Sequence, residues 1–322
     1  MARSDTGKLL TVCNYDPHTN FWGTYWENVK FKVEKVDVEL YRKQILEHTN
    51  NFRKNHPQVD PLVLDDAISA FAQEWADTLA KNDKLEHRPK NAQKFGENVF
   101  MGSEINECWP TDYWYNEIAE FEWDNMEKES TRHFTQLVWK ASKKLGVGVA
   151  RSEQGNWYVV CNYDPSGNVP GKFGDNVKPD YDLNEYRKKL LTAINALRKE
   201  YHAEPIVLDE TMNKNAQATA EKYSKGKVEF EPSLQFCTVF YSEGTDCVAN
   251  PTHLWFVNTQ EKALDWKKLE DNKADTFTQA IWQSTKKMGA GIFRKGNNFY
   301  TVTCFYPKGN LKGKFADNCK PK

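Results

Sequence analysis

The chain has 322 residues, which suggests two domains at the usual size of about 100–200 residues each. A formal net charge of −1 excludes a global field that would favour nucleic acid or anionic lipid. No stretch reaches the ~18–20 apolar residues of a membrane span, and the many aromatic residues, with 11 Trp and 18 Phe, are enough for two hydrophobic cores. We therefore expect a folded protein with no nucleic-acid partner.

The N-terminal segment resembles the tail of a domain whose body is missing. Residues 11–17 (TVCNYDP) match residues 159–165 (VVCNYDP). A lone strand and turn cannot bury a core, so we expect residues 1–38 to be a remnant and linker, loosely docked or paired at a sheet edge. The first residues lack the apolar stretch of a signal peptide, which as written predicts a cytoplasmic protein, and an extracellular one if the N-terminus is truncated.

Helical spacing of apolar residues predicts helices over 39–55 and 66–81, the second with Asp65 or Asp66 as its N-cap. Further helices are expected over 109–127 and about 131–139. The runs 145–151 and 157–163 are typical of strands, and the turn 154–156 between them predicts a hairpin. Helices before and between a few antiparallel strands indicate an α+β layered domain.

The chain contains a long internal repeat. Residues 131–163 align without a gap with residues 274–306, at an offset of 143. A repeat of this length is a whole domain, and the polar linker 178–182 marks the boundary. We expect one domain over 39–179 and a second over 183–322, the latter with strands over 289–294 and 299–306.

Cysteines are sparse and odd in number for this length. A disulfide framework is open, but we favour reduced and buried thiols. The seven are Cys13, Cys108, Cys161, Cys237, Cys247, Cys304 and Cys319.

Four ordered motifs then carry a resemblance to a known family. Residues 132–139 (RHFTQLVW), 158–168 (YVVCNYDPSGN), 96–99 (GENV) and 50–65 resemble signatures of the CAP superfamily of cysteine-rich secretory proteins, antigen 5 and pathogenesis-related 1 proteins. The cysteine-poor form is most similar to the Golgi-associated plant pathogenesis-related subgroup. The resemblance implies two tandem α-β-α sandwiches, each with a small, mainly antiparallel sheet between helices.

The resemblance also implies a cleft with two histidines and two glutamates, here His87, Glu97, Glu117 and His133. Two imidazoles with a carboxylate suit weakly bound Zn or another divalent cation. The same groups can also work without metal, as carboxylate–imidazole pairs. The sequence has no HExxH motif and no nucleophile tied to a base, so no residue is assigned as catalytic.

At the offset of 143, the second domain lacks this set. The aligned residues are Phe230 for His87, Phe240 for Glu97, Gln260 for Glu117 and Thr276 for His133, with Glu243 as a shifted relic of the glutamate. Because none of the four aligned residues is a good metal ligand, we expect no metal there and a scaffold or recognition role.

These expectations lead to a functional hypothesis and an alternative. The first is a non-catalytic CAP-type binding protein that engages a lipid or sterol, a membrane surface or a protein partner, with a divalent-metal cleft in the first domain. The alternative is a metal-dependent hydrolase that uses the same four residues. The resemblance further implies a homodimer and the Golgi periphery or the extracellular region as locations.

Overall fold

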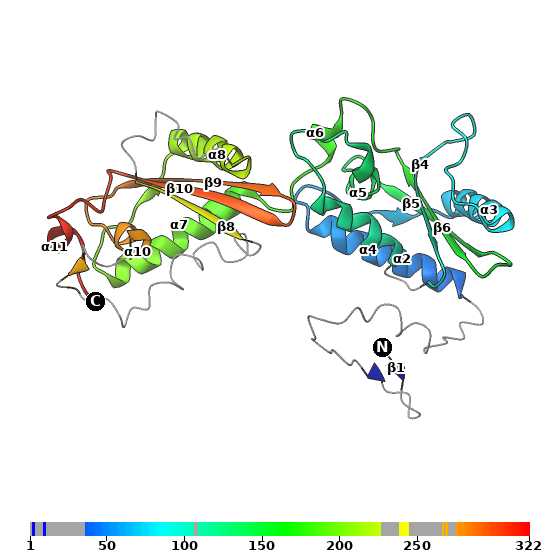
Figure 1. Ribbon diagram of the computed structural model, residues 1–322, viewed down its shortest axis with the longest axis horizontal. Helices are drawn as coiled ribbons and strands as arrows, with labels where there is room; N and C mark the ends of the chain where they lie inside the picture. Colours follow the sequence, from blue (N-terminus) through cyan, green and yellow to red (C-terminus); the bar gives the residue numbers. More distant parts are fainter. Residues whose placement is uncertain are drawn as a thin grey trace. The chain divides into compact units, whose positions relative to one another are not determined.

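A computed structural model describes residues 2–3, 9–10, 36–105, 109–226, 238–244, 266, 268–269 and 275–322 (Figure 1). Met1–Asp37 form a unit of their own, in which β1 (Ala2–Arg3) pairs antiparallel with β2 (Leu9–Leu10). The predicted match of residues 11–17 to a domain tail lies outside the described residues.

The first domain is built around a four-stranded sheet of order β3-β5-β6-β4. Strand β3 pairs parallel with β5, whereas the other neighbours are antiparallel, as expected from the sequence. In chain order the elements are α2 (Val38–Lys54), β3 (Val63–Leu64), α3 (Asp66–Asn82), β4 (Gly96–Gly102), α4 (Trp109–Asn116), η1 (Glu117–Ala119), η2 (Glu129–Thr131), α5 (Arg132–Leu137), β5 (Lys144–Arg151), β6 (Trp157–Asp164) and α6 (Phe173–Asn176).

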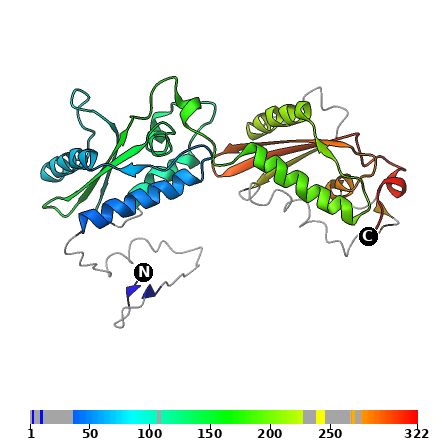
Figure 2. The same cartoon turned by 180° about the vertical axis from the view of Figure 1, so that it is seen from behind.

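The second domain repeats this plan with a sheet of order β7-β9-β10-β8. Helices α7 and α8 cover opposite faces of that sheet (Figures 1 and 2). The elements are α7 (Leu183–Glu200), β7 (Val207–Leu208), α8 (Glu210–Ser224), β8 (Thr238–Gly244), α10 (Asp275–Ala280), β9 (Lys287–Lys295), β10 (Asn298–Tyr306) and α11 (Phe315–Asn318). The predicted α+β class and the repeat are confirmed.

Glycines in the central strands explain how closely one helix layer approaches each sheet. A Cβ at Gly148 would lie 2.4 Å from the backbone of Ala72 in α3, and a Cβ at Gly291 would lie 2.4 Å from the backbone of Ala216 in α8. Since side chains alternate along a strand, residues such as Val147 point to the other face, where the Nε of Arg42 in α2 donates to its carbonyl at 2.8 Å. Both repeats therefore have a helix on each face.

One predicted helix is wrong in length. The helix expected over 109–127 ends at Asn116 and continues only as the short 3-10 turn η1. Because the helix ends early, Phe121 lies in the core, where its ring centroid is 5.2 Å from that of Phe134. Burial of this aromatic ring outweighs the helical pattern, which by itself favours a continuous helix.

The structure describes three of the seven cysteines and the linker between the two domains. Cys161, Cys304 and Cys319 are buried free thiols, as expected, and the other four cysteines lie outside the described residues. The linker is packed, because the hydroxyl of Tyr181 donates to the carbonyl of Ile292 at 3.1 Å and its ring lies against the second core.

His56 is a buried imidazole that follows α2 and contacts the C-terminal end of the first domain. Its Nδ1 donates to the carbonyl of Lys178 at 2.6 Å, and its Nε2 accepts from the hydroxyl of Tyr115 at 3.0 Å. Burial lowers the pKa of His56 below its usual value, against a smaller raising effect of the Lys178 carbonyl. The charged groups that face it are Asp180, Arg294 and Arg53.

This lowered pKa predicts acid destabilisation. Below about pH 6.5 the unfolded chain binds a proton at His56 that the native protein does not, so stability is complete above that pH and falls as the pH drops toward the lowered native value, by up to about 1.4 kcal/mol per unit. In urea unfolding between about pH 7 and pH 5.5 we expect His56→Gln to flatten this slope. The exposed His202→Gln serves as control, and equal slopes in both variants would refute the assignment.

Candidate functional site

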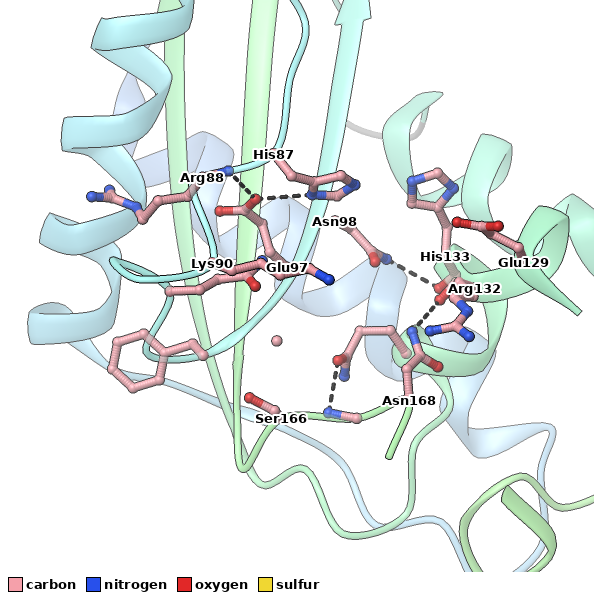
Figure 3. A pocket seen from close by; sticks show the side chains of 15 residues that line it. His87, Arg88, Lys90, Glu97, Asn98, Glu129, Arg132, His133, Ser166 and Asn168 are labelled. Carbon is pink, nitrogen blue, oxygen red and sulfur yellow. Dashed lines mark hydrogen bonds and ion pairs between the residues drawn. The ribbon is translucent and has the colours of Figure 1, made fainter. Parts of the chain in front are cut away.

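The structure brings the four sequence-predicted cleft residues together from four different segments. His87 lies in the loop after α3, Glu97 is the second residue of β4, Glu117 opens η1, and His133 is the second residue of α5. The rings of His87 and His133 have centroids 6.4 Å apart and planes 24° apart. Figure 3 shows the two imidazoles facing one another across the cleft.

His87 is oriented by a buried carboxylate. Its Nδ1 lies 2.9 Å from Oε1 of Glu97, and the same oxygen accepts from the backbone N–H of Arg88 at 2.9 Å. The Glu97 side chain is fully buried, whereas that of His87 is 53% exposed. Because a carboxylate only accepts, Nδ1 carries a proton, which leaves the lone pair of the neutral tautomer on Nε2. Nε2 has no hydrogen-bond partner among the described residues.

His133 is held in the same way by the second carboxylate. Its Nδ1 lies 2.6 Å from Oε1 of Glu117. The other oxygen of Glu117 accepts from the backbone N–H groups of His133 and Phe134, both at 3.0 Å. The Trp114 ring stacks on the imidazole with centroids 6.2 Å apart. Glu117 thus fixes both the first turn of α5 and the direction of the imidazole, and Nε2 again has no hydrogen-bond partner in the described part of the chain.

Around the imidazoles is a cavity of about 530 Å³. Most of the residues that line it have polar or charged side chains, and Phe95 contributes a phenyl ring. Sequence reasoning missed the further charged groups Arg88, Lys90, Glu129 and Arg132. The complete lining is His87, Arg88, Lys90, Gln93, Phe95, Gly96, Glu97, Asn98, Glu129, Arg132, His133, Gln136, Ser166, Gly167 and Asn168.

The donor set offers a cation two imidazole nitrogens. Both glutamates use oxygens to hold Nδ1 atoms and backbone N–H groups, which places them behind the histidines. Within the described ranges no group of three or more His, Cys, Asp and Glu side chains is arranged to hold a metal ion. Carboxylate–imidazole pairs of this kind are the usual outer shell of metal-binding histidines. Two imidazole nitrogens are thus the protein ligands that this cleft offers, and a cation bound there would need its remaining ligands from water or a partner.

Comparison with known proteins decides the family. The profile of the CAP, cysteine-rich secretory protein, family matches residues 46–163 and again residues 191–306. The chain belongs to the CAP family. Protein PRY2 of Saccharomyces cerevisiae is 37% identical over 133 residues, which span 40% of this chain and 39% of PRY2. Golgi-associated plant pathogenesis-related protein 1 of Homo sapiens is 35% identical over 155 residues, 45% of this chain and 97% of that protein.

The chain is also similar to solved structures, at lower sequence identity. NaASP2, whose crystal structure is described as being with Zn²⁺, is 24% identical with a TM-score of 0.36 and covers 41% of this chain and 82% of its own. Na-ASP-1 is 13% identical with a TM-score of 0.35 and covers 85% of this chain and 91% of its own. Separately, no helix in the described part of the chain is long and apolar enough to cross a membrane.

The second CAP domain corrects one alignment made from the sequence. Glu97 pairs with Asn162 in the first sheet, and the corresponding residue of β10, Phe305, pairs with Thr238. The counterpart of Glu97 is therefore Thr238, and the assignment to Phe240 is wrong because the constant offset does not hold before β8. Glu243 pairs with Tyr300 toward the other end of β8, so it is no shifted relic of the cleft glutamate.

Of the other three aligned positions, one lies in the described residues. Thr276 lies on α10, at the place of His133 on α5. Phe230 and Gln260 lie outside the described residues. At the two cleft positions that can be compared, the second CAP domain thus has threonine where the first has a glutamate and a histidine.

Proposed function

We propose that the first CAP domain is a non-catalytic binding module whose cleft holds a divalent cation such as Zn²⁺ on the Nε2 atoms of His87 and His133. The observation that carries the proposal is the matched orientation of the two imidazoles. Each has its Nδ1 occupied by a carboxylate, and the two rings face one another 6.4 Å apart. A bound cation would supply positive charge and open coordination positions for a partner's polar group.

The lining offers contacts to a polar partner group. Most of its side chains are charged or amides, which can form hydrogen bonds and ion pairs with that group. In this proposal a lipid or protein partner is engaged through its polar part. The second domain, which lacks the histidine and the glutamate at the comparable positions, serves as scaffold or recognition surface.

The same contacts favour binding over hydrolysis. A hydrolase needs a carboxylate or imidazole free to take a proton from water at the metal. Both oxygens of Glu117 are engaged, and Oε1 of Glu97 already accepts two hydrogen bonds. The two glutamates that the hydrolase alternative would use are therefore committed to holding the histidines.

Zinc titration by calorimetry tests this proposal. We expect wild type to bind one equivalent of Zn²⁺ that is absent from His133→Ala, because two imidazoles supply all the protein donors of the site. Thr276→Ala, the aligned change on α10, is the matched control and should bind like wild type. Cysteines add background uptake, so the readout is the difference of one equivalent. Identical uptake by wild type and His133→Ala would refute the proposal.

A further inference from the structure

The guanidinium of Arg132 is unusual among the arginines near the cleft. It lines the cavity beside His133 but forms no hydrogen bond or ion pair with any described residue, and its Nε is buried without an acceptor (Figure 3). By contrast, the Nη groups of Arg88 bond to the Phe71 carbonyl at 2.7 Å and to Glu74 at 3.3 Å. A buried N–H without a partner is costly, so Arg132 keeps binding capacity that the fold does not use.

The backbone of Arg132 is nevertheless firmly placed. Its carbonyl accepts from Nδ2 of Asn168 at 2.9 Å and from the hydroxyl of Thr135 at 3.3 Å. The base of the side chain is therefore fixed at the start of α5, one residue before His133. An unpaired group on a fixed support is what a ligand-binding arginine requires.

The charge around Arg132 favours an anion. Lys90 also lines the cavity, is exposed and makes no ion pair within the described residues. The carboxylate of Glu97 is turned into the protein toward His87 and the Arg88 backbone. Glu129 is an exposed carboxylate of the lining, but it forms no ion pair with Arg132 in the described structure. Two cationic side chains with no ion-pair partner among the described residues thus line the same cavity as the two imidazoles.

We propose that Arg132, assisted by Lys90, binds a carboxylate or phosphate group of the partner that occupies this cleft. The planar guanidinium can present Nε and one Nη to two oxygens of an oxyanion, which would satisfy the orphaned Nε–H after a small rotation of the side chain. This inference rests on the proposed function, since the oxyanion would lie beside the cation held by the histidines. The partner's polar group is then an oxyanion.

The second domain provides an internal contrast. The residue aligned with Arg132 is Asp275, the exposed first residue of α10, so the charge at this position is reversed. Oxyanion binding should therefore be confined to the first domain.

The test follows the side-chain Nε–H resonance of Arg132 by NMR in metal-free protein, prepared on a chelating resin because soluble chelators are themselves carboxylates. Succinate and inorganic phosphate are titrated separately, and the tighter of the two identifies the oxyanion. We expect a saturable shift of this resonance in wild type. In every protein the affinity is read from the backbone amide shifts of the residues that line the cavity, and we expect it to be weaker by about tenfold or more in Arg132→Gln. The affinity of Arg132→Lys should lie between those of wild type and Arg132→Gln, because lysine keeps the positive charge but lacks the two parallel N–H donors of the guanidinium.

Arg151→Gln is the matched control. Arg151 is exposed at the end of β5, does not line the cavity, and its replacement changes the net charge equally. An absent shift, or equal weakening in Arg151→Gln, would overturn the inference. Zinc uptake without oxyanion binding would refute this inference and leave the proposed function standing. Oxyanion binding without zinc uptake would refute the proposed function and leave the oxyanion site at Arg132 standing.

Discussion

Replacing Arg53 by leucine should lower the free energy of unfolding by about 3–5 kcal/mol. The Arg53 side chain is fully buried and donates to four backbone carbonyls rather than to a carboxylate. Burial lowers its pKa to about 10, so it stays charged at neutral pH. Leucine would leave those carbonyls without a donor inside the protein. They belong to Asp60, Leu137, Trp139 and Ser142, at 2.8–3.1 Å.

Arg198→Leu is the matched change in the second domain, since Arg198 makes the equivalent bonds there. Urea unfolding gives the size of each effect, and hydrogen exchange locates it. We expect faster exchange in β5 and β6 for Arg53→Leu and in β9 and β10 for Arg198→Leu. The Arg198 acceptors are the carbonyls of Glu204, Ala280, Trp282 and Thr285.

The exposed Arg151→Gln loses a hydrogen bond to the Gly155 carbonyl and a contact with the Trp157 ring, and it should lower stability by no more than about 1 kcal/mol. If Arg53→Leu were no more destabilising than this control, the buried guanidinium would not be a determinant of the fold.

Arg53 and Arg198 occupy the same place in the two domains, and such repeated core residues explain why the sequence predicts the main helices and strands. Periodicity predicts α2 and α3 because each has one buried face, whereas β5 and β6 are buried on both faces and appear as short apolar runs on either side of a turn. The same pattern recurs in the second domain. Gln136 and Gln279 are another shared pair: each accepts from a backbone N–H, of Gly167 at 2.8 Å and Gly309 at 2.9 Å. Residues that satisfy backbone groups are kept in both repeats, so the second domain keeps its fold without the cleft set.

Sequence reasoning failed where contacts distant in the chain decide. The register of β8 against β10 moves the counterpart of Glu97 to Thr238, which no constant offset can show. Arg132 was overlooked because a basic residue at the start of a helix is typically solvated. Only the packed structure shows its Nε buried without an acceptor in the cavity wall. The sequence also named four cleft residues without separating the two imidazoles that face the cavity from the glutamates that orient them.

Glu117→Gln should bind zinc within about tenfold of wild type, whereas Glu117→Ala should lose about 10–100-fold. Glutamine keeps an oxygen that can accept from Nδ1 of His133 or from the two backbone N–H groups, but it is a poor metal ligand. Alanine removes the orienting contact and the cap of α5, with a stability loss of about 1 kcal/mol. Calorimetric zinc titration of the two variants beside His133→Ala gives the ranking, and urea unfolding gives the stability.

The ranking separates two ways in which the same four residues could hold a cation. If Glu117 is itself a ligand, as the sequence alone allows, Glu117→Gln must bind as poorly as His133→Ala. If it only orients the imidazole, as the 2.6 Å contact with Nδ1 indicates, the glutamine variant must stay close to wild type. Glu97→Gln should behave in the same way, because the fully buried Glu97 contacts Nδ1 of His87 from behind. The cation affinity of the cleft would then depend on two imidazole nitrogens, and the glutamates would act by fixing their direction.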